Sequence, residues 1–222
     1  MEYLLIHLIM RFFDLIINIL LLLNLNMIEL FFDTETENII PRNIHPKHFE
    51  KYEKARLVTI AWCLRDENNI YSQHYAIVKN NIEEREIGAE FIHGINREMV
   101  DKFGKPLESV LDMFMKDVQI CERIVCHNIE FDMKIVASEL FRLGRDYDAE
   151  NVLLCDSFCT MKESTNIVKI PSKFGTSYKW PKLVELHNFL FGRGFDGEHN
   201  AQSDNVALIN CYYKLKNKID LE

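Results

Sequence analysis

The stretch Met27–Glu35, "MIELFFDTE", is a run of mostly apolar side chains that ends in two acids. A short, nearly continuous apolar run is typical of a strand buried on both faces of a sheet. Because side chains alternate along a strand, Asp33 and Glu35 point to the same side. Both acids come last in the run and therefore lie at the carboxyl end of the strand. In α/β proteins, ligand-binding sites form at the carboxyl ends of the strands. The stretch therefore predicts a core strand that presents two carboxylates.

The pattern downstream predicts the rest of the fold. Two strands follow, "RLVTIAWCL" at 56–64 and "IYSQHYAIV" at 70–78, joined by the turn "RDENN". Helices and strands then alternate: a helix after Pro106, the strand "RIVCHN" at 123–128, a helix from about Phe131 to Gly144, the strand "NVLLCDSF" at 151–158, a helix with Pro181 as its first residue, and a helix from about Asn200. This order predicts an α/β fold with a mixed five-stranded sheet flanked by helices.

Two of the predicted helices carry an acid on the apolar side. Asp132 precedes Ile135 and Val136 by three and four residues, and Asp204 stands in the same relation to Ala207 and Leu208. For any single acid, a solvated strand end or a favourable first helical turn is the simpler explanation.

The four acids together are harder to explain in that way. Buried side by side, they would raise one another's pKa unless a cation joined them, and no arginine occupies a matching position. Oxygen ligands suit hard divalent cations such as Mg²⁺ or Mn²⁺. The sequence therefore predicts a metal site made of Asp33, Glu35, Asp132 and Asp204.

His199 stands five residues before Asp204, in "HNAQSD", just ahead of the last helix. A histidine at a helix entrance is often only a surface or capping residue. Beside a metal site, however, neutral imidazole is suited to removing a proton from an attacking water. We expect His199 to be a general base.

Three motifs, "FDTET" (32–36), "HNIEFD" (127–132) and "HNAQSD" (199–204), together resemble the exonuclease motifs of the DEDDh family. Members of that family include the epsilon proofreading subunit of bacterial DNA polymerase III. The resemblance extends from Ile28 to Leu215 and includes "IHGI" at 92–95. It implies a ribonuclease H-like fold, two Mg²⁺ or Mn²⁺ ions held by the four acids, and His199 as the base. The implied reaction is stepwise 3′→5′ hydrolysis of nucleic acid, with DNA favoured, to nucleoside 5′-monophosphates.

The same resemblance implies which residues border the last nucleotide. They are Thr34, Glu35, Asn128 and Phe131, with His93 lining the same pocket. Phe131 is equally explained by core packing, and His93, which precedes a glycine, by a helix cap. These alternatives stay open.

A basic segment lies between Met161 and Leu183 in a chain that is otherwise acidic. It has one acid, Glu163, and five lysines: Lys162, Lys169, Lys173, Lys179 and Lys182. Lysines interleaved with Tyr178 and Trp180 suit single-stranded nucleic acid, although lysines on a loop are usually just solvated. We expect this segment, with Lys179, to hold the phosphate backbone.

Composition limits the classes of partner and compartment. The net charge is −8, with 26 basic and 34 acidic residues, which argues against coating of nucleic acid by bulk positive charge and favours weak, salt-sensitive binding at 3′ ends. The six cysteines form no C-x-x-C pair, so we expect free thiols in a reducing intracellular compartment such as the cytoplasm.

Residues 1–26 are nearly all apolar and are expected to lie outside an exonuclease domain at 27–222. The segment is long enough to span a bilayer, but it contains Arg11 and Asp14 and lacks the features of a signal peptide. Met27 stands directly before the first strand. We rank an upstream extension absent from the native protein first, a membrane anchor second and a packed helix third.

Two other functions remain compatible with the motifs. An RNA-trimming 3′→5′ exoribonuclease would use the same site residues. A non-catalytic partner of a polymerase would keep the fold but is expected to lack at least one of the five catalytic residues, all of which are present. Proofreading would need a DNA polymerase in trans.

Overall fold

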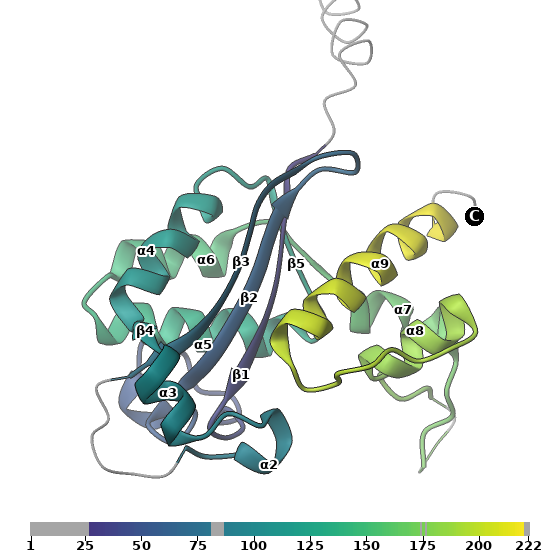
Figure 1. The fold of residues 1–222 in the computed structure, drawn as a ribbon. Helices are drawn as coiled ribbons and strands as arrows, with labels where there is room; N and C mark the ends of the chain where they lie inside the picture. The colour runs from purple at the N-terminus through teal and green to yellow at the C-terminus, as the bar shows by residue number, and fades with distance from the viewer. Residues whose placement is uncertain (1–26, 81–86, 174, 176, 220–222) are drawn as a thin grey trace, which may run out of the picture.

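The computed structural model describes residues 27–80, 87–173, 175 and 177–219. Its centre is a six-stranded sheet in the spatial order β4-β3-β2-β1-β5-β6 (Figure 1). The strands are β1 (Glu29–Thr36), β2 (Leu57–Arg65), β3 (Ile70–Lys79), β4 (Lys105–Pro106), β5 (Arg123–Cys126) and β6 (Ser157–Cys159). β1 pairs antiparallel with β2 and parallel with β5, so the sheet is mixed and β1 lies inside it.

Helices cover both faces of the sheet. They are η1 (Phe49–Tyr52), α2 (Glu90–His93), α3 (Arg97–Phe103), α4 (Leu107–Val118), α5 (Ile129–Arg142), α6 (Asp146–Leu154), α7 (Thr160–Val168), α8 (Leu183–Phe191) and α9 (Ala201–Ile219). α4, α5 and α6 lie on one side, and α9 crosses the other with α7 and α8 beside it (Figure 1). Within the described part of the chain, no helix is both long enough and apolar enough to cross a membrane. The expectations for residues 1–26 fall outside the described residues.

The alternation of side chains along β1 explains why it is buried on both faces. Leu30 and Phe32 belong to the large core under α4 and α5. Phe31 belongs to a second core with Leu208 and Tyr212 of α9. Odd-numbered residues of β1 therefore face α9, and even-numbered residues face α5.

The sheet has one strand more than the five predicted, because the two-residue β4 pairs with the end of β3. The predicted strand at 151–158 was wrong in its first half. Residues 151–154 complete α6, whose buried Ala149 and Val152 are three residues apart, and only Ser157–Cys159 form a strand. A short apolar run fits either structure when its periodicity is not resolved.

Two helix starts also differ from the prediction. α5 begins at Ile129 rather than at about Phe131. α8 begins at Leu183 rather than at Pro181, because the Lys182 backbone N–H donates to a Glu185 carboxylate oxygen at 2.8 Å and so caps the helix.

A buried ion pair joins β2 to α5. Arg56 donates to both carboxylate oxygens of Glu139 at 2.7 and 3.0 Å, and the Leu57 backbone N–H donates to the same group at 3.1 Å. Glu139 is fully buried. This contact holds the C-terminal half of α5 against the start of β2.

We predict that Glu139→Ala lowers the free energy of unfolding by about 3–5 kcal/mol, because it leaves the Arg56 guanidinium buried without its partner. Urea unfolding measures the change. Glu130→Ala, which breaks an exposed pair with Lys134 on the same helix, is the matched control and should cost less than about 1 kcal/mol. Equal losses in the two variants would contradict the structural role given to the Arg56–Glu139 pair.

Candidate active site

Three carboxylates meet where β1 leaves the core. Asp33 and Glu35 are half-buried on the side of β1 that faces α9, and Asp204 is buried in the first turn of α9. One oxygen atom from each carboxylate lies within 4.8 Å of the others. Asp33 and Glu35 thus come close to Asp204 because α9 packs on the face of the sheet to which the odd-numbered residues of β1 point.

Asp132 approaches from the opposite side of the strand. Its Oδ1 accepts hydrogen bonds from the Thr34 backbone N–H at 3.0 Å and from Thr34 Oγ1 at 2.7 Å. This backbone donor is free because β5 pairs with β1 only as far as Phe31, so the edge of β1 is open beyond that point. Asp132 is not one of the three acids whose oxygen atoms lie within 4.8 Å of one another. It is hydrogen-bonded to Thr34, the residue between Asp33 and Glu35.

Burial and mutual repulsion disfavour the charged forms of these acids. Burial raises the pKa of Asp33 well above its usual value, and the charges of Asp132, Asp204 and Glu35 raise it further. Burial is also the largest cause that raises the pKa of Glu35, Asp132 and Asp204, each to about 7. The Thr34 hydrogen bonds oppose the rise at Asp132, and the His199 backbone N–H opposes it at Asp204.

This arrangement fits a divalent cation. The donors are all carboxylate oxygens, they converge on one point, and their repulsion is relieved when positive charge lies between them. Asp33, Glu35 and Asp204 could contact a cation directly, and Asp132 could do so with the oxygen that Thr34 leaves free.

His199 lies in the loop that leads into α9. Its backbone has a left-handed conformation, with φ of 65°, and its N–H donates to Asp204 Oδ2 at 2.9 Å. The imidazole ring is exposed. The loop is therefore attached to the carboxylate cluster through its backbone, while the ring can exchange protons with water.

A cavity of about 320 Å³ opens next to Glu35. Three of the predicted substrate-binding residues, Glu35, Phe131 and His93, line it, and so do Ile39, Phe91 and Ile92. His93 is buried: its Nδ1 accepts from the Ile95 N–H at 3.0 Å and its Nε2 lies 2.9 Å from the Gly88 carbonyl oxygen. His93 thus fixes the turn after α2 and also forms part of the cavity wall.

The other predicted substrate-binding residues are placed differently. Asn128 is exposed and left-handed, with φ of 71°, at the point where β5 turns into α5. Lys179 contacts both carboxylate oxygens of Glu185, at 2.6 and 2.8 Å. The charge of Lys179 is therefore partly neutralised by Glu185, so Lys179 is less available to bind a phosphate.

Two further residues near the site, His127 and Phe91, were not predicted as functional from the sequence. His127 is half-buried: its Nδ1 lies 3.0 Å from Thr160 Oγ1, and its Nε2 lies 2.9 Å from the Pro181 carbonyl oxygen. Burial lowers the pKa of His127 to about 4, so the ring is neutral and joins the end of the basic segment to the turn before α5. Phe91 is 91% exposed at the cavity rim. In the sequence, the place of this aromatic residue directly before "IHGI" was the signal that could have found it.

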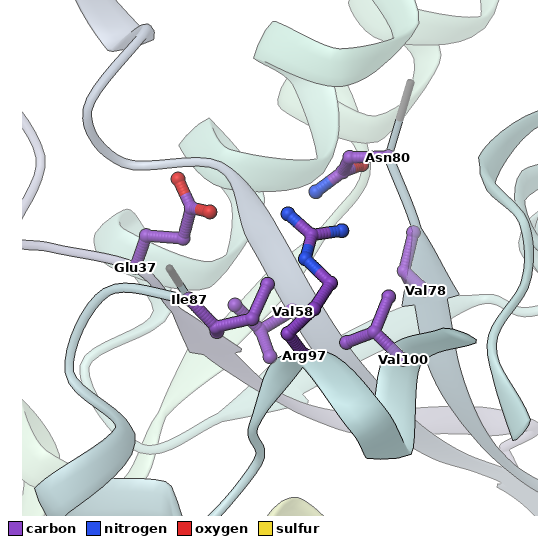
Figure 2. A pocket seen from close by; sticks show the side chains of 7 residues that line it. All are labelled: Glu37, Val58, Val78, Asn80, Ile87, Arg97 and Val100. Carbon is purple, nitrogen blue, oxygen red and sulfur yellow. The ribbon is translucent and has the colours of Figure 1, made fainter. Parts of the chain in front are cut away.

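A second hollow lies between β2, β3 and α3 and holds only about 10 Å³ (Figure 2). Figure 2 shows the Arg97 guanidinium rising from α3 toward Asn80, with Glu37 on the other side and valines and Ile87 below. This volume admits about one water molecule. The cavity beside Glu35, in contrast to this hollow, is large enough for part of a nucleotide.

Comparison with known proteins finds no family model and no curated protein that matches the chain. Solved structures of nucleases do match it in fold. Their names describe exonucleases or a ribonuclease domain. The match therefore confirms the expected α/β, ribonuclease H-like fold, and at these low identities it establishes the fold alone.

Three of these structures illustrate the range. Escherichia coli Exonuclease I in complex with a dT13 oligonucleotide has a TM-score of 0.60 and 16% identity, over 87% of this chain and 41% of that one. A 3′-exonuclease described as recognising the 3′ end of a histone mRNA stem-loop has a TM-score of 0.61 and 14% identity, over 87% and 83%. The RNase domain of yeast Pop2 has a TM-score of 0.56 and 11% identity, over 87% and 77%. The chain spans about two fifths of the length of Exonuclease I.

The raised pKa values predict a specific pH dependence of stability without divalent cations. Protons bind these acids more tightly in the folded than in the unfolded protein, so their stabilising effect is complete below the unfolded values near 4 and is lost as pH rises to about 7. In EDTA, the free energy of unfolding should therefore fall between pH 4 and 7. Urea unfolding at a series of pH values measures this slope.

Asp204→Asn should make that slope shallower, because one of the repelling carboxyls no longer titrates. Glu67→Gln, which changes an exposed acid in the turn between β2 and β3, is the matched control and should keep the wild-type slope. A stability that rises with pH over this range, or an unchanged slope in Asp204→Asn, would show that the acids are not coupled as described.

Proposed function

We propose that the chain is a divalent-metal-dependent 3′→5′ exonuclease that removes nucleoside 5′-monophosphates one at a time from nucleic acid, with DNA favoured. The observation that carries this proposal is the convergence of Asp33, Glu35 and Asp204 within 4.8 Å, with Asp132 held beside them by Thr34. The likeness in fold to structures described as exonucleases supports phosphodiester hydrolysis as the chemistry.

The carboxylates are proposed to act as metal ligands. Two bound Mg²⁺ or Mn²⁺ ions would stabilise the negative charge that develops on the scissile phosphate and on the departing 3′ oxygen. Asp33 and Glu35 are fixed by their places in β1, and Asp204 by the first turn of α9. Thr34 orients Asp132 by taking up one of its oxygens.

His199 is proposed as the general base. Its exposed ring takes the proton of the attacking water, whose oxygen bonds to phosphorus while the bond to the 3′ oxygen of the preceding nucleotide breaks. The departing 3′ oxygen takes a proton from solvent, and the ring returns its proton to solvent. The hydrogen bond from the His199 backbone to Asp204 keeps the base within the same site as the acids.

The cavity beside Glu35 is proposed to receive the last nucleotide. Its apolar lining, which includes Phe91 and Phe131, favours an unstacked base, and therefore a single-stranded 3′ end. The lysines of the segment 162–182 would contact the phosphates further back along the strand, with Lys179 the least available of them because of its pair with Glu185. Contacts between these lysines and phosphates predict that binding weakens as salt rises, and the net charge of −8 predicts that binding is weak overall.

We also propose a cellular compartment and a partner for the chain. The six cysteines are free thiols, which fits a reducing intracellular compartment such as the cytoplasm. A role in DNA replication or repair as a proofreading activity would require a DNA polymerase as partner in trans.

The test is degradation of 5′-labelled single-stranded DNA and RNA by the full chain, with Mg²⁺, with Mn²⁺ and with EDTA. We expect a ladder that shortens from the 3′ end, requires the metal and is faster on DNA. Asp33→Ala should reduce the rate at least about 10²-fold because it removes a ligand for the charge-stabilising cations. His199→Ala should reduce it about 10²- to 10⁴-fold because it removes the base.

Glu67→Gln is the matched control, since it neutralises an exposed acid at the opposite end of the sheet, and its rate should equal that of the wild type. Faster shortening of RNA than of DNA would move the assignment to an exoribonuclease. Cleavage that persists in Asp33→Ala, or no cleavage of either polymer, would sink the catalytic assignment and favour a non-catalytic partner of a polymerase.

A further inference from the structure

Two cysteines meet at the end of the sheet opposite the carboxylates. Cys121 follows α4, and Cys155 directly follows the last residue of α6. Their sulfur atoms are 3.9 Å apart, so the two thiols are in contact. Both residues are half-buried, so small solutes can reach them. Neither residue has a part in the proposed nuclease site.

The surrounding contacts hold the two chain segments side by side. The Ile124 N–H donates to the Asp156 carbonyl oxygen at 2.8 Å, one residue after Cys155. The Arg123 side chain donates to the Asp156 carboxylate at 2.7 Å. Both contacts join the same segments that carry the sulfurs. The proximity of Cys121 and Cys155 therefore follows from the start of the β5–β6 pairing and not from one chance rotamer.

The pair is also placed where a bond could form without breaking the sheet. Cys121 and Cys155 lie outside β5 and β6, between the ends of helices and the first residues of strands. A disulfide needs sulfur atoms about 2.05 Å apart. Closing the gap from 3.9 Å requires side-chain rotation and a shift of these two connecting segments.

The other cysteines provide an internal comparison. Cys126 and Cys159 are direct partners in the register of β5 and β6, yet they are 0% and 7% exposed, inside the core. Cys63 and Cys211 are likewise buried. Among the six thiols, only those of Cys121 and Cys155 combine mutual contact with partial exposure.

The two thiols differ in reactivity. The hydrogen bond with Cys121 lowers the pKa of Cys155 to about 7, whereas the pKa of Cys121 is raised by the same contact and by burial. Because the thiolate is the form that reacts with peroxide, the lowered pKa makes Cys155 the more reactive of the two thiols. Cys121 stays protonated until it attacks the oxidised partner.

We propose that Cys121 and Cys155 form a reversible disulfide in response to hydrogen peroxide. The Cys155 thiolate attacks the peroxide, which is reduced to hydroxide, and becomes a sulfenic acid. The Cys121 sulfur then attacks the Cys155 sulfur, the S–O bond breaks, and one water leaves with the proton of Cys121. An external dithiol restores both thiols by exchange.

The disulfide would stabilise the segment that carries Asp132. It joins positions 34 residues apart and so encloses β5, α5 and α6 in one covalent loop. Cross-linking reduces the freedom of the unfolded chain, and the folded structure already holds the ends of the loop together. The oxidised protein should therefore resist unfolding more strongly, with its carboxylate site unchanged.

The experiment treats the reduced full chain with hydrogen peroxide, blocks the remaining thiols with an alkylating agent and measures intact and peptide masses. We expect a loss of about 2 Da, assigned to a Cys121–Cys155 peptide, with four thiols still available to alkylation after unfolding. The midpoint of urea unfolding should rise by roughly 1 M on oxidation and return with a dithiol.

Three matched variants separate this disulfide from other effects of peroxide. Cys121→Ser should accumulate oxidised Cys155 without a stability gain, Cys155→Ser should stay reduced at Cys121, and Cys159→Ser should behave as the wild type. The wild-type comparison of reduced and oxidised protein decides the question even if a variant folds poorly. A disulfide between other cysteines or between chains, oxidation of Cys155 beyond sulfenic acid with no disulfide, or no reaction would each overturn the proposal.

Discussion

The burial of four carboxyl groups side by side at the end of β1, and the repulsion between their charged forms, is the constraint on which the rest of the structure depends. Four acids whose pKa values are all raised lie beside one strand end, so their ionised forms oppose folding at neutral pH. The cores on both faces of β1 provide the opposing stabilisation, with Leu30 and Phe32 on one face and Phe31 on the other. The unfavourable free energy of the buried acids is thus offset by apolar packing on both faces of the strand that carries two of them.

The position of the acids follows from the fit between β1 and α9. Tyr212 and Tyr213 of α9 donate hydrogen bonds to the buried Glu29 at the start of β1. From Tyr212 back to Asp204 the helix rises about 12 Å, and from Glu29 to Asp33 the strand rises about 13 Å. The two elements therefore run alongside each other over equal lengths, and anchoring one end sets Asp204 against Asp33 at the other.

The sequence was sufficient wherever a local period determined the result. The alternation in Glu29–Thr36 and the helical spacing behind Asp132 and Asp204 place these side chains on the observed faces. The sequence was insufficient where the position of a side chain depends on a residue from another part of the chain. Nothing near Lys179 reveals how closely Glu185 would hold it, and nothing near His127 indicates that its ring would join Thr160 to Pro181. The run at 151–154 could be either helix or strand until its packing against α5 was known.

Binding of Mn²⁺ to the full chain, measured by titration calorimetry near pH 7, tests the central claim most directly. If the carboxylates form one cation site, binding should be saturable, should release protons in keeping with the raised pKa values, and should weaken at least about tenfold in Asp33→Asn and in Asp204→Asn but not in Glu67→Gln. Equal Mn²⁺ affinity in all four proteins, or binding without proton release, would contradict the account.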